Sequence, residues 1–149
     1  MKYFTFEELT ASTTAKRLKI DNRPSADIKS QLKALVDNVL DPLRRAWGEP
    51  IIVTSGYRCP ELNKRVGGAK NSQHMYGQAA DIRTQTDTRE DNMQLLRLLL
   101  SLNLPFDKCI SEYVNAKGEP DWIHVSYSPA KRKELWTCRA GTYTRGIKL

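Results

Sequence analysis

The sequence predicts a single α+β domain over residues 1–149, with a small, mainly antiparallel sheet flanked by helices. Three observations predict this class. A chain of 149 residues with 40% hydrophobic content can bury one sizeable core and needs no second domain. Apolar residues recur at helical spacing in two long segments. Short runs of strand-forming residues are separated by turn sequences, and two of these runs are placed to form a hairpin.

The first helices are expected to begin at polar capping residues. Thr5 with Glu8 has the pattern of a capping box and opens a short helix, TFEELTAS. Ser25 can cap a longer helix, and Pro42 is expected to kink or restart it, with Asp41 as a new cap. Its apolar face follows helical spacing: Ile28, Leu32, Leu35, Val36, Val39, Leu40, Leu43 and Trp47.

The middle of the chain alternates strands with helices. A strand is expected over residues 50–53, followed by a short helix near 60–65 and the loop VGGAKNS, whose glycines let it border a site. A further short strand is expected in AADIR. The next main helix follows Thr88, because Glu90 and Asp91 suit the positive end of a helix dipole.

The last third of the chain predicts further strands. CISEYV, NAKGEP and WIHVSYS have the pattern of strand, turn and strand, and therefore of a hairpin. The final segment, ELWTCRAGTYTRG, has strand character with weaker alternation. Its tryptophan and tyrosine are expected to pack in the core or at the sheet edge rather than to contact a ligand.

Both histidines of the chain lie in dense polar motifs, SQHMYGQAAD and DWIH. Catalytic zinc is commonly held by three nitrogen or oxygen ligands, with a fourth position left for water. His74, Asp81 and His124 can supply such a set. Small residues between the first two allow a tight turn, and strand alternation gives His124 one defined face. Either histidine alone is more typical of a hydrogen-bonded structural residue, but together the motifs predict a zinc site.

A zinc hydrolase also needs a group that moves protons between water and the leaving amine. Asp121 is the first candidate, because it lies three residues before His124 and just after a turn, and Glu119 is its competitor. Arg58, at the end of a predicted strand, can hold an oxyanion or a carboxylate, since guanidinium binds carboxylates in a bidentate manner. The structural alternatives are a turn acid for Asp121 and a surface ion pair for Arg58.

Taken in order, SGYR, SxHxxGxAxD and DWIH resemble the motifs of a known family. They are similar to those of the zinc D-alanyl-D-alanine carboxypeptidases, dipeptidases and phage endolysin peptidases, which share a fold with the hedgehog signalling domain. The similarity runs from the helix before Pro50 to the strand that contains His124. It implies a hedgehog/DD-peptidase-like fold with one zinc peptidase domain over residues 1–149.

The resemblance also implies roles for individual residues. Its zinc ligands correspond to His74, Asp81 and His124. It implies that Asp121 is the catalytic base and that Arg58 binds the substrate or the transition state. Ser72 matches the motif serine and is implied to orient the substrate or a ligand. An aspartate at the base position is more typical of the carboxypeptidase branch than of the dipeptidase branch.

We therefore expect a hydrolase, a zinc metallopeptidase that cleaves bacterial cell-wall peptide, with D-alanyl-D-alanine carboxypeptidase as the preferred activity. A peptidoglycan endopeptidase of the phage endolysin kind is the alternative within this class. A non-catalytic zinc-stabilised binding module, like the hedgehog domain, is the alternative from another class. The expected cofactor is zinc, the expected partner is the peptidoglycan stem peptide, and the expected state is a monomer.

Composition argues against several other classes. The longest apolar stretch, 95–104, is interrupted by polar residues and is shorter than the roughly 20 residues that span a bilayer, so no membrane partner is expected. The net charge of +7 favours polyanions, but no nucleic-acid-binding motif accompanies it, and nucleic acid is not an expected partner.

The cysteines and the N-terminus bear on location. Three cysteines leave at least one unpaired in a monomer, which argues against a disulfide framework and favours a reduced compartment. Cys59 is not expected to be a nucleophile, because the histidines are better explained as metal ligands. The segment MKYFTFEEL lacks the apolar core of a signal peptide. We expect synthesis in the cytoplasm, with action at the bacterial cell wall after release.

Overall fold

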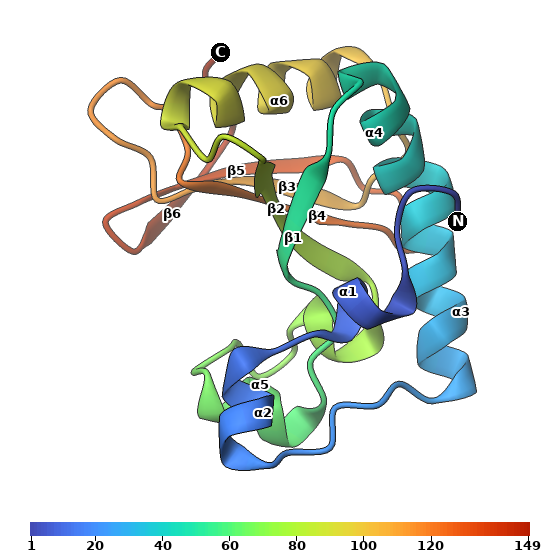
Figure 1. Ribbon diagram of the computed structural model, residues 1–149. Coiled ribbons are helices and arrows are strands. Elements are labelled where there is room, and N and C mark those ends of the chain that lie inside the picture. Colours follow the sequence, from blue (N-terminus) through green and yellow to red (C-terminus); the bar gives the residue numbers. More distant parts are fainter.

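Six strands form one sheet in the computed structural model, which describes all 149 residues (Figure 1). Their order is β1-β2-β4-β3-β5-β6, and every neighbouring pair is antiparallel except β3 and β5. The predicted α+β class with a mainly antiparallel sheet is therefore confirmed. The strands are β1 (Ile51–Ser55), β2 (Ala79–Thr84), β3 (Lys108–Glu112), β4 (Trp122–Ser126), β5 (Glu134–Arg139) and β6 (Thr142–Arg145).

The helices begin where the capping residues predict. Thr5 forms a complete capping box with Glu8, and Ser25 and Thr88 each accept a backbone hydrogen bond at the start of a helix. The α-helices are α1 (Phe6–Thr10), α2 (Thr13–Leu18), α3 (Ala26–Leu35), α4 (Asp41–Trp47), α5 (Pro60–Arg65) and α6 (Arg89–Ser101). None of them combines the length and the apolar character needed to cross a bilayer.

The long helix continues through Pro42 and does not restart at a new cap. A π-helical turn, η1 (Val36–Leu40), joins α3 to α4 directly before the proline, whose missing N–H would interrupt regular α-helical bonding. Asp41 has helical backbone angles and does not cap α4. Its buried carboxylate instead accepts hydrogen bonds from the backbone N–H groups of Lys2 and Tyr3 at 2.6 and 3.1 Å. The prediction of Asp41 as a cap is wrong because this long-range contact uses its side chain.

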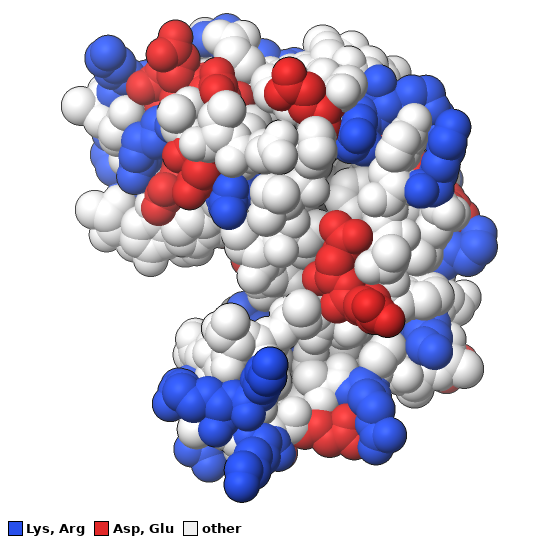
Figure 2. Space-filling view, viewed as in Figure 1, with Lys and Arg blue, Asp and Glu red and all other residues white.

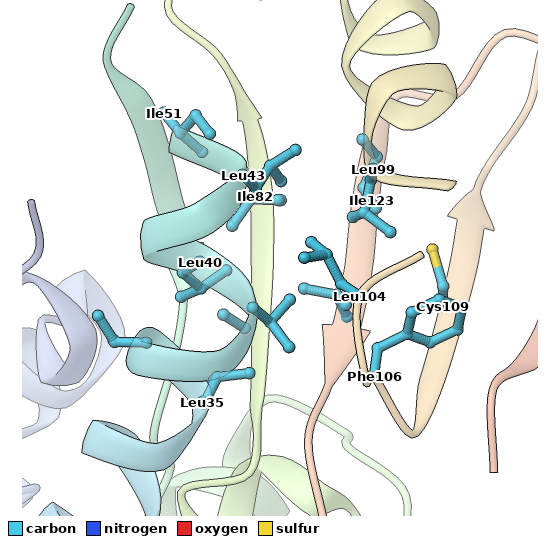
Figure 3. Close-up of a cluster of buried hydrophobic side chains, with 14 of the residues drawn as sticks. Leu35, Leu40, Leu43, Ile51, Ile82, Leu99, Leu104, Phe106, Cys109 and Ile123 are labelled. Carbon is cyan, nitrogen blue, oxygen red and sulfur yellow. The ribbon is translucent and has the colours of Figure 1, made fainter. Parts of the chain in front are cut away.

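The hydrophobic core lies between one face of the sheet and helices α3, α4 and α6. Figure 3 shows Leu43 beside Ile82 of β2, and Leu99 of α6 beside Ile123 of β4. Because side chains alternate along a strand, the residues between these apolar ones must point to the opposite face. In β2 and β4 this alternation places Asp81 and His124 on that second face.

The second face of the sheet borders a cleft. On the far side of the cleft lie α2, α5 and the short 3₁₀ helix η2 (Gln73–Tyr76), and Figure 2 shows the surface deeply hollowed between this lower part and the sheet. The lower part carries a group of lysine and arginine side chains (Figure 2). The fold thus covers one face of the sheet with helices and leaves the other accessible from solvent.

Candidate active site and metal centre

The three predicted metal ligands meet at the floor of this cleft. His74 comes from η2, Asp81 from β2 and His124 from the neighbouring β4, where it pairs directly with Asp81. His74 Nε2 lies 3.4 Å from Asp81 Oδ1, and His124 Nδ1 lies 3.1 Å from the same oxygen. All three can offer ligand atoms within 4.8 Å of one another. We call these residues the His-Asp-His cluster.

The orientation of His74 is set by a backbone carbonyl. Its Nδ1 lies 2.7 Å from the carbonyl oxygen of Gly56. A carbonyl only accepts hydrogen bonds, so Nδ1 must carry the proton, and the lone pair of the ring lies on Nε2, which faces Asp81. Gly56 itself is required, because a Cβ there would lie 2.1 Å from the backbone oxygen of Leu9. The chain thus presents Nε2 of His74 as a metal ligand.

The charge state of the cluster suits a cation. Burial raises the pKa of Asp81, but the electrostatic interaction with His74 and the hydrogen bond with His124 outweigh burial and hold that pKa well below its usual range. Burial lowers the pKa of His124, against the opposing effect of Asp81. At neutral pH the cluster therefore offers an ionised carboxylate and a neutral His124 imidazole, the forms that bind metals.

The donor set and its spacing fit zinc. Ligands about 2.1 Å from a tetrahedral zinc ion lie roughly 3.4 Å from one another. The two separations of 3.1 and 3.4 Å within the cluster match that value. Two imidazoles and one carboxylate also leave a fourth position open, as catalytic zinc sites do. Zinc is therefore the cofactor that these residues suit.

The cluster opens into a cavity of about 650 Å³ that is also lined by Arg58 and Ser72. Ser72 Oγ accepts a hydrogen bond from the backbone N–H of His74 and lies 3.4 Å from Arg58 Nη2, so it links the guanidinium to the ligand-bearing turn. Arg58 Nε is buried and has no hydrogen-bond partner. The guanidinium lines the cavity and forms no ion pair with an acid, so it can donate to an anion there.

Neither acid predicted as the base lies in this cavity. The Asp121 side chain is 52% exposed, and its closest cation is Arg89, with Nη2 4.0 Å from Oδ1. Glu119 accepts a hydrogen bond from Asn115 within the turn. Asp121 lies three positions before His124, and in an extended chain an odd offset places side chains on opposite sides. The structure thus directs Asp121 away from the cluster.

The acid that does line the cavity is Glu112, on β3, which sequence reasoning missed. It lies two residues after Ile110, which pairs with His124, so both point to the same face of the sheet. Glu112 is only 6% exposed, and burial together with the negative charge of Asp81 raises its pKa to about 7. The signal in the sequence was an acid at the end of the strand KCISE, which pairs with the strand of His124.

Aromatic residues form another wall of the cavity. Trp122, Trp136 and Tyr143 line it, and the ring of Tyr113 stacks on Trp122 with centroids 5.2 Å apart. Trp136 and Tyr143 belong to the final segment, for which only packing roles were expected. β5 and β6 extend the sheet beside the cleft, so these edge residues also border the cavity, a placement that weak local alternation does not reveal.

A buried aspartate supports the turn that carries His74. Asp107 is fully buried and accepts hydrogen bonds from Gln73 Nε2 at 2.9 Å and from Arg132 Nε and Nη2 at 3.0 and 2.9 Å. The hydrogen bonds from Arg132 hold the pKa of Asp107 well below its usual range. A depressed pKa means that this stabilisation is present above the pKa of an unfolded aspartate and is lost as the pH falls.

Asp107→Ala is expected to lower the free energy of unfolding by about 2 kcal/mol at neutral pH, since it leaves Gln73 and Arg132 without their acceptor. Urea denaturation measures the change, and the difference between variant and wild type should shrink in acid. Asp21→Ala is the control, because the Asp21–Arg23 ion pair is exposed and its loss should leave the midpoint unchanged. Equal midpoints for Asp107→Ala and wild type would contradict the supporting role.

Comparison with known proteins agrees with this site. A family model described as Peptidase M15 matches residues 2–126. A curated relative, the zinc D-Ala-D-Ala carboxypeptidase of Streptomyces albus G, is 52% identical over 44 residues, which are 29% of this chain and 17% of the relative. The aligned stretch thus spans less than a fifth of that relative. The family match includes the whole His-Asp-His cluster and Glu112, and ends before β5 and β6.

Proposed function

The chain belongs to the peptidase M15 family as a zinc metallopeptidase, and we propose that it removes the terminal D-alanine from the stem peptide of bacterial peptidoglycan. The observation that carries the proposal is a single cavity that holds the His-Asp-His cluster, a buried acid and a guanidinium that forms no ion pair. The short likeness to a D-Ala-D-Ala carboxypeptidase supports the same substrate.

Zinc bound by the His-Asp-His cluster would polarise the scissile carbonyl and make water more acidic. In our proposal Glu112, rather than Asp121, takes the proton from the attacking water and delivers it to the nitrogen of the leaving D-alanine. Two observations support Glu112: it lines the cavity, and its side chain points to the same face of the sheet as His124.

Arg58 would explain why the enzyme cleaves the bond next to the C-terminal carboxylate of its substrate. A carboxypeptidase substrate ends in a free carboxylate next to the scissile bond, whereas an internal bond has none there. Arg58 lines the cavity, which no other arginine does, and its guanidinium forms no ion pair, so it would bind the substrate carboxylate. Ser72 would hold the guanidinium through its 3.4 Å contact with Nη2, and thereby orient the substrate indirectly.

An endopeptidase that cleaves within the wall peptide is the second candidate, and the form of the cleft favours it. Figure 2 shows the hollow open to solvent along one side of the molecule, so a peptide could extend past the cluster in both directions. Both activities place the action at the cell wall, with the stem peptide as partner.

Zinc-loaded protein is expected to release free D-alanine from a synthetic stem pentapeptide that ends in D-alanyl-D-alanine. The matched control is the same peptide with an amidated C-terminus, which lacks the carboxylate for Arg58 and should be cleaved poorly. Mass spectrometry of the products identifies the bond. Internal fragments from crosslinked peptidoglycan, without free D-alanine, would favour the endopeptidase. Bound zinc with no product from any substrate would favour a non-catalytic binding module.

A further inference from the structure

Lys108 is a cation in the cavity that the proposed function does not use. It lines the cavity from β3, and its ammonium group forms no ion pair and donates no hydrogen bond within the protein. We propose that Lys108 binds a carboxylate on a side chain of the substrate, and that the enzyme therefore prefers stem peptides that carry a carboxylate on the residue before the two D-alanines. This preference rests on the proposed function, which places the scissile bond between those D-alanines.

Strand alternation places Lys108 on the same face of the sheet as the His-Asp-His cluster. Lys108 and Ile110 both line the cavity, whereas Cys109 between them packs in the core. Ile110 is opposite His124 in the β3–β4 pair, and Lys108 lies two residues before it, about 7 Å along the strand. The ammonium group, on a flexible four-carbon stem, thus faces the part of the cavity beside the cluster.

The acid opposite Lys108 already has partners. Glu134 pairs with Lys108 in the β3–β5 register. One of its carboxylate oxygens, Oε1, accepts a hydrogen bond from Trp136 Nε1 at 3.0 Å, and the other, Oε2, lies 3.0 Å from Arg132 Nη1. Glu134 therefore leaves the ammonium group of Lys108 without an ion pair.

The acids of the cavity wall do not pair with Lys108 either. Asp81 belongs to the His-Asp-His cluster, and Glu112 is four residues from Lys108, about 13 Å along β3. The cavity therefore holds two cations without an acid partner. Arg58 directly precedes Cys59, the cap of α5, on the far side of the cleft, whereas Lys108 belongs to the sheet. Electrostatic complementarity then favours a substrate with two carboxylates.

The chemistry of a stem peptide determines where the second carboxylate lies. With the terminal carboxylate at Arg58 and the scissile carbonyl at the cluster, the D-alanine on the other side of the bond offers only a methyl group. The nearest side chain that can bear a carboxylate is that of the preceding residue. Lysine and diaminopimelate differ by one carboxylate at the end of the same side chain, so stem pentapeptides with one or the other at this position isolate the contact.

Wild-type protein is expected to cleave the diaminopimelate pentapeptide with a kcat/KM about tenfold above that for the lysine pentapeptide, because Lys108 makes a charge-assisted contact with only one of them. Lys108→Met should reduce this ratio to about one, and its value for the lysine peptide should stay within about threefold of wild type. Initial rates of D-alanine release measure both values.

Lys117→Met is the matched control, because it removes the same charge from the exposed turn between β3 and β4, outside the cavity wall. Lys117 forms no ion pair, so the preference for diaminopimelate should stay unchanged. A control variant that loses the preference as fully as Lys108→Met would overturn the contact, because the effect would then follow from net charge alone.

Binding of the same two peptides to zinc-free protein measures the contact without turnover. Trp122 and Trp136 line the cavity, so tryptophan fluorescence reports its occupancy. Lys108→Met should raise Kd for the diaminopimelate peptide about tenfold and change Kd for the lysine peptide much less.

The outcomes separate the role of Lys108 from the proposed function. Release of D-alanine at equal kcat/KM from both peptides, or a preference that survives in Lys108→Met, would overturn the role of Lys108 and leave the proposed function intact. No D-alanine from either peptide, with a binding preference that Lys108→Met abolishes, would overturn the proposed function and support the carboxylate site. With neither turnover nor a difference in binding, both are overturned.

Discussion

Glu112→Gln is expected to lower kcat for stem-peptide hydrolysis at least about 100-fold, whereas Asp121→Asn should leave kcat within about threefold of wild type. The amide of glutamine has nearly the shape of the carboxylate, but it cannot accept a proton. Glu112 lines the cavity that contains the His-Asp-His cluster, while Asp121 is exposed and faces Arg89. Initial rates of D-alanine release, with zinc content measured on the same samples, determine both values.

The pair of variants distinguishes two assignments of the base. The motif DWIH and the family resemblance favour Asp121, and the geometry favours Glu112. Circular dichroism and the midpoint of urea denaturation should match wild type in both variants, so that a loss of rate reports chemistry rather than folding. A large loss in Asp121→Asn with an active Glu112→Gln would return the role to Asp121 and require the segment before β4 to rearrange when substrate binds.

His124→Ala is expected to lower bound zinc from about one ion per chain to a small fraction after dialysis, because two of the three protein ligands cannot hold a catalytic zinc ion tightly. His124 is 12% exposed and its Nδ1 lies 3.1 Å from Asp81, so no neighbouring group can take its place without moving the strand. Atomic absorption measures the metal content. Addition of zinc should raise the thermal midpoint of wild type and not that of the variant, because only a bound ion stabilises the fold.

Lys108→Ala is the matched control for the zinc measurement. Lys108 lines the same cavity from the neighbouring strand β3, but it is not a metal ligand in the proposed site. Its loss should leave the zinc content unchanged. Full zinc content in both His74→Ala and His124→Ala would contradict the assigned centre.

Much of the fold was predictable because its determinants are local. Thr5, Ser25 and Thr88 each satisfy backbone N–H groups within three residues, so the starts of α1, α3 and α6 follow from the sequence alone. Asp41 shows the limit of this approach. Its partners, Lys2 and Tyr3, are almost 40 residues away along the chain, and no local rule identifies them.

The metal ligands were predictable for a different reason. Metal binding restricts the choice of residue types severely, and a chain with two histidines offers few combinations. Their motifs identified His74, Asp81 and His124 before any contact between β2 and β4 was known. A carboxylate acting on water is less restricted in sequence, because any acid that faces the cavity can serve, and three acids compete for that role in the segment from Glu112 to Asp121.

The zinc ligands, the main helices and the α+β class thus follow from residue type and spacing, because each depends on chemistry within a short stretch of chain. The positions of Glu112 and Tyr143 at the cavity depend on the pairing of β3 with β4 and β5 and of β5 with β6. Strand pairing joins residues that are distant in sequence, and a shift of one residue in register would turn Glu112 to the core face. Only the tertiary structure sets that register, and it therefore decides which acid lines the cavity beside the His-Asp-His cluster.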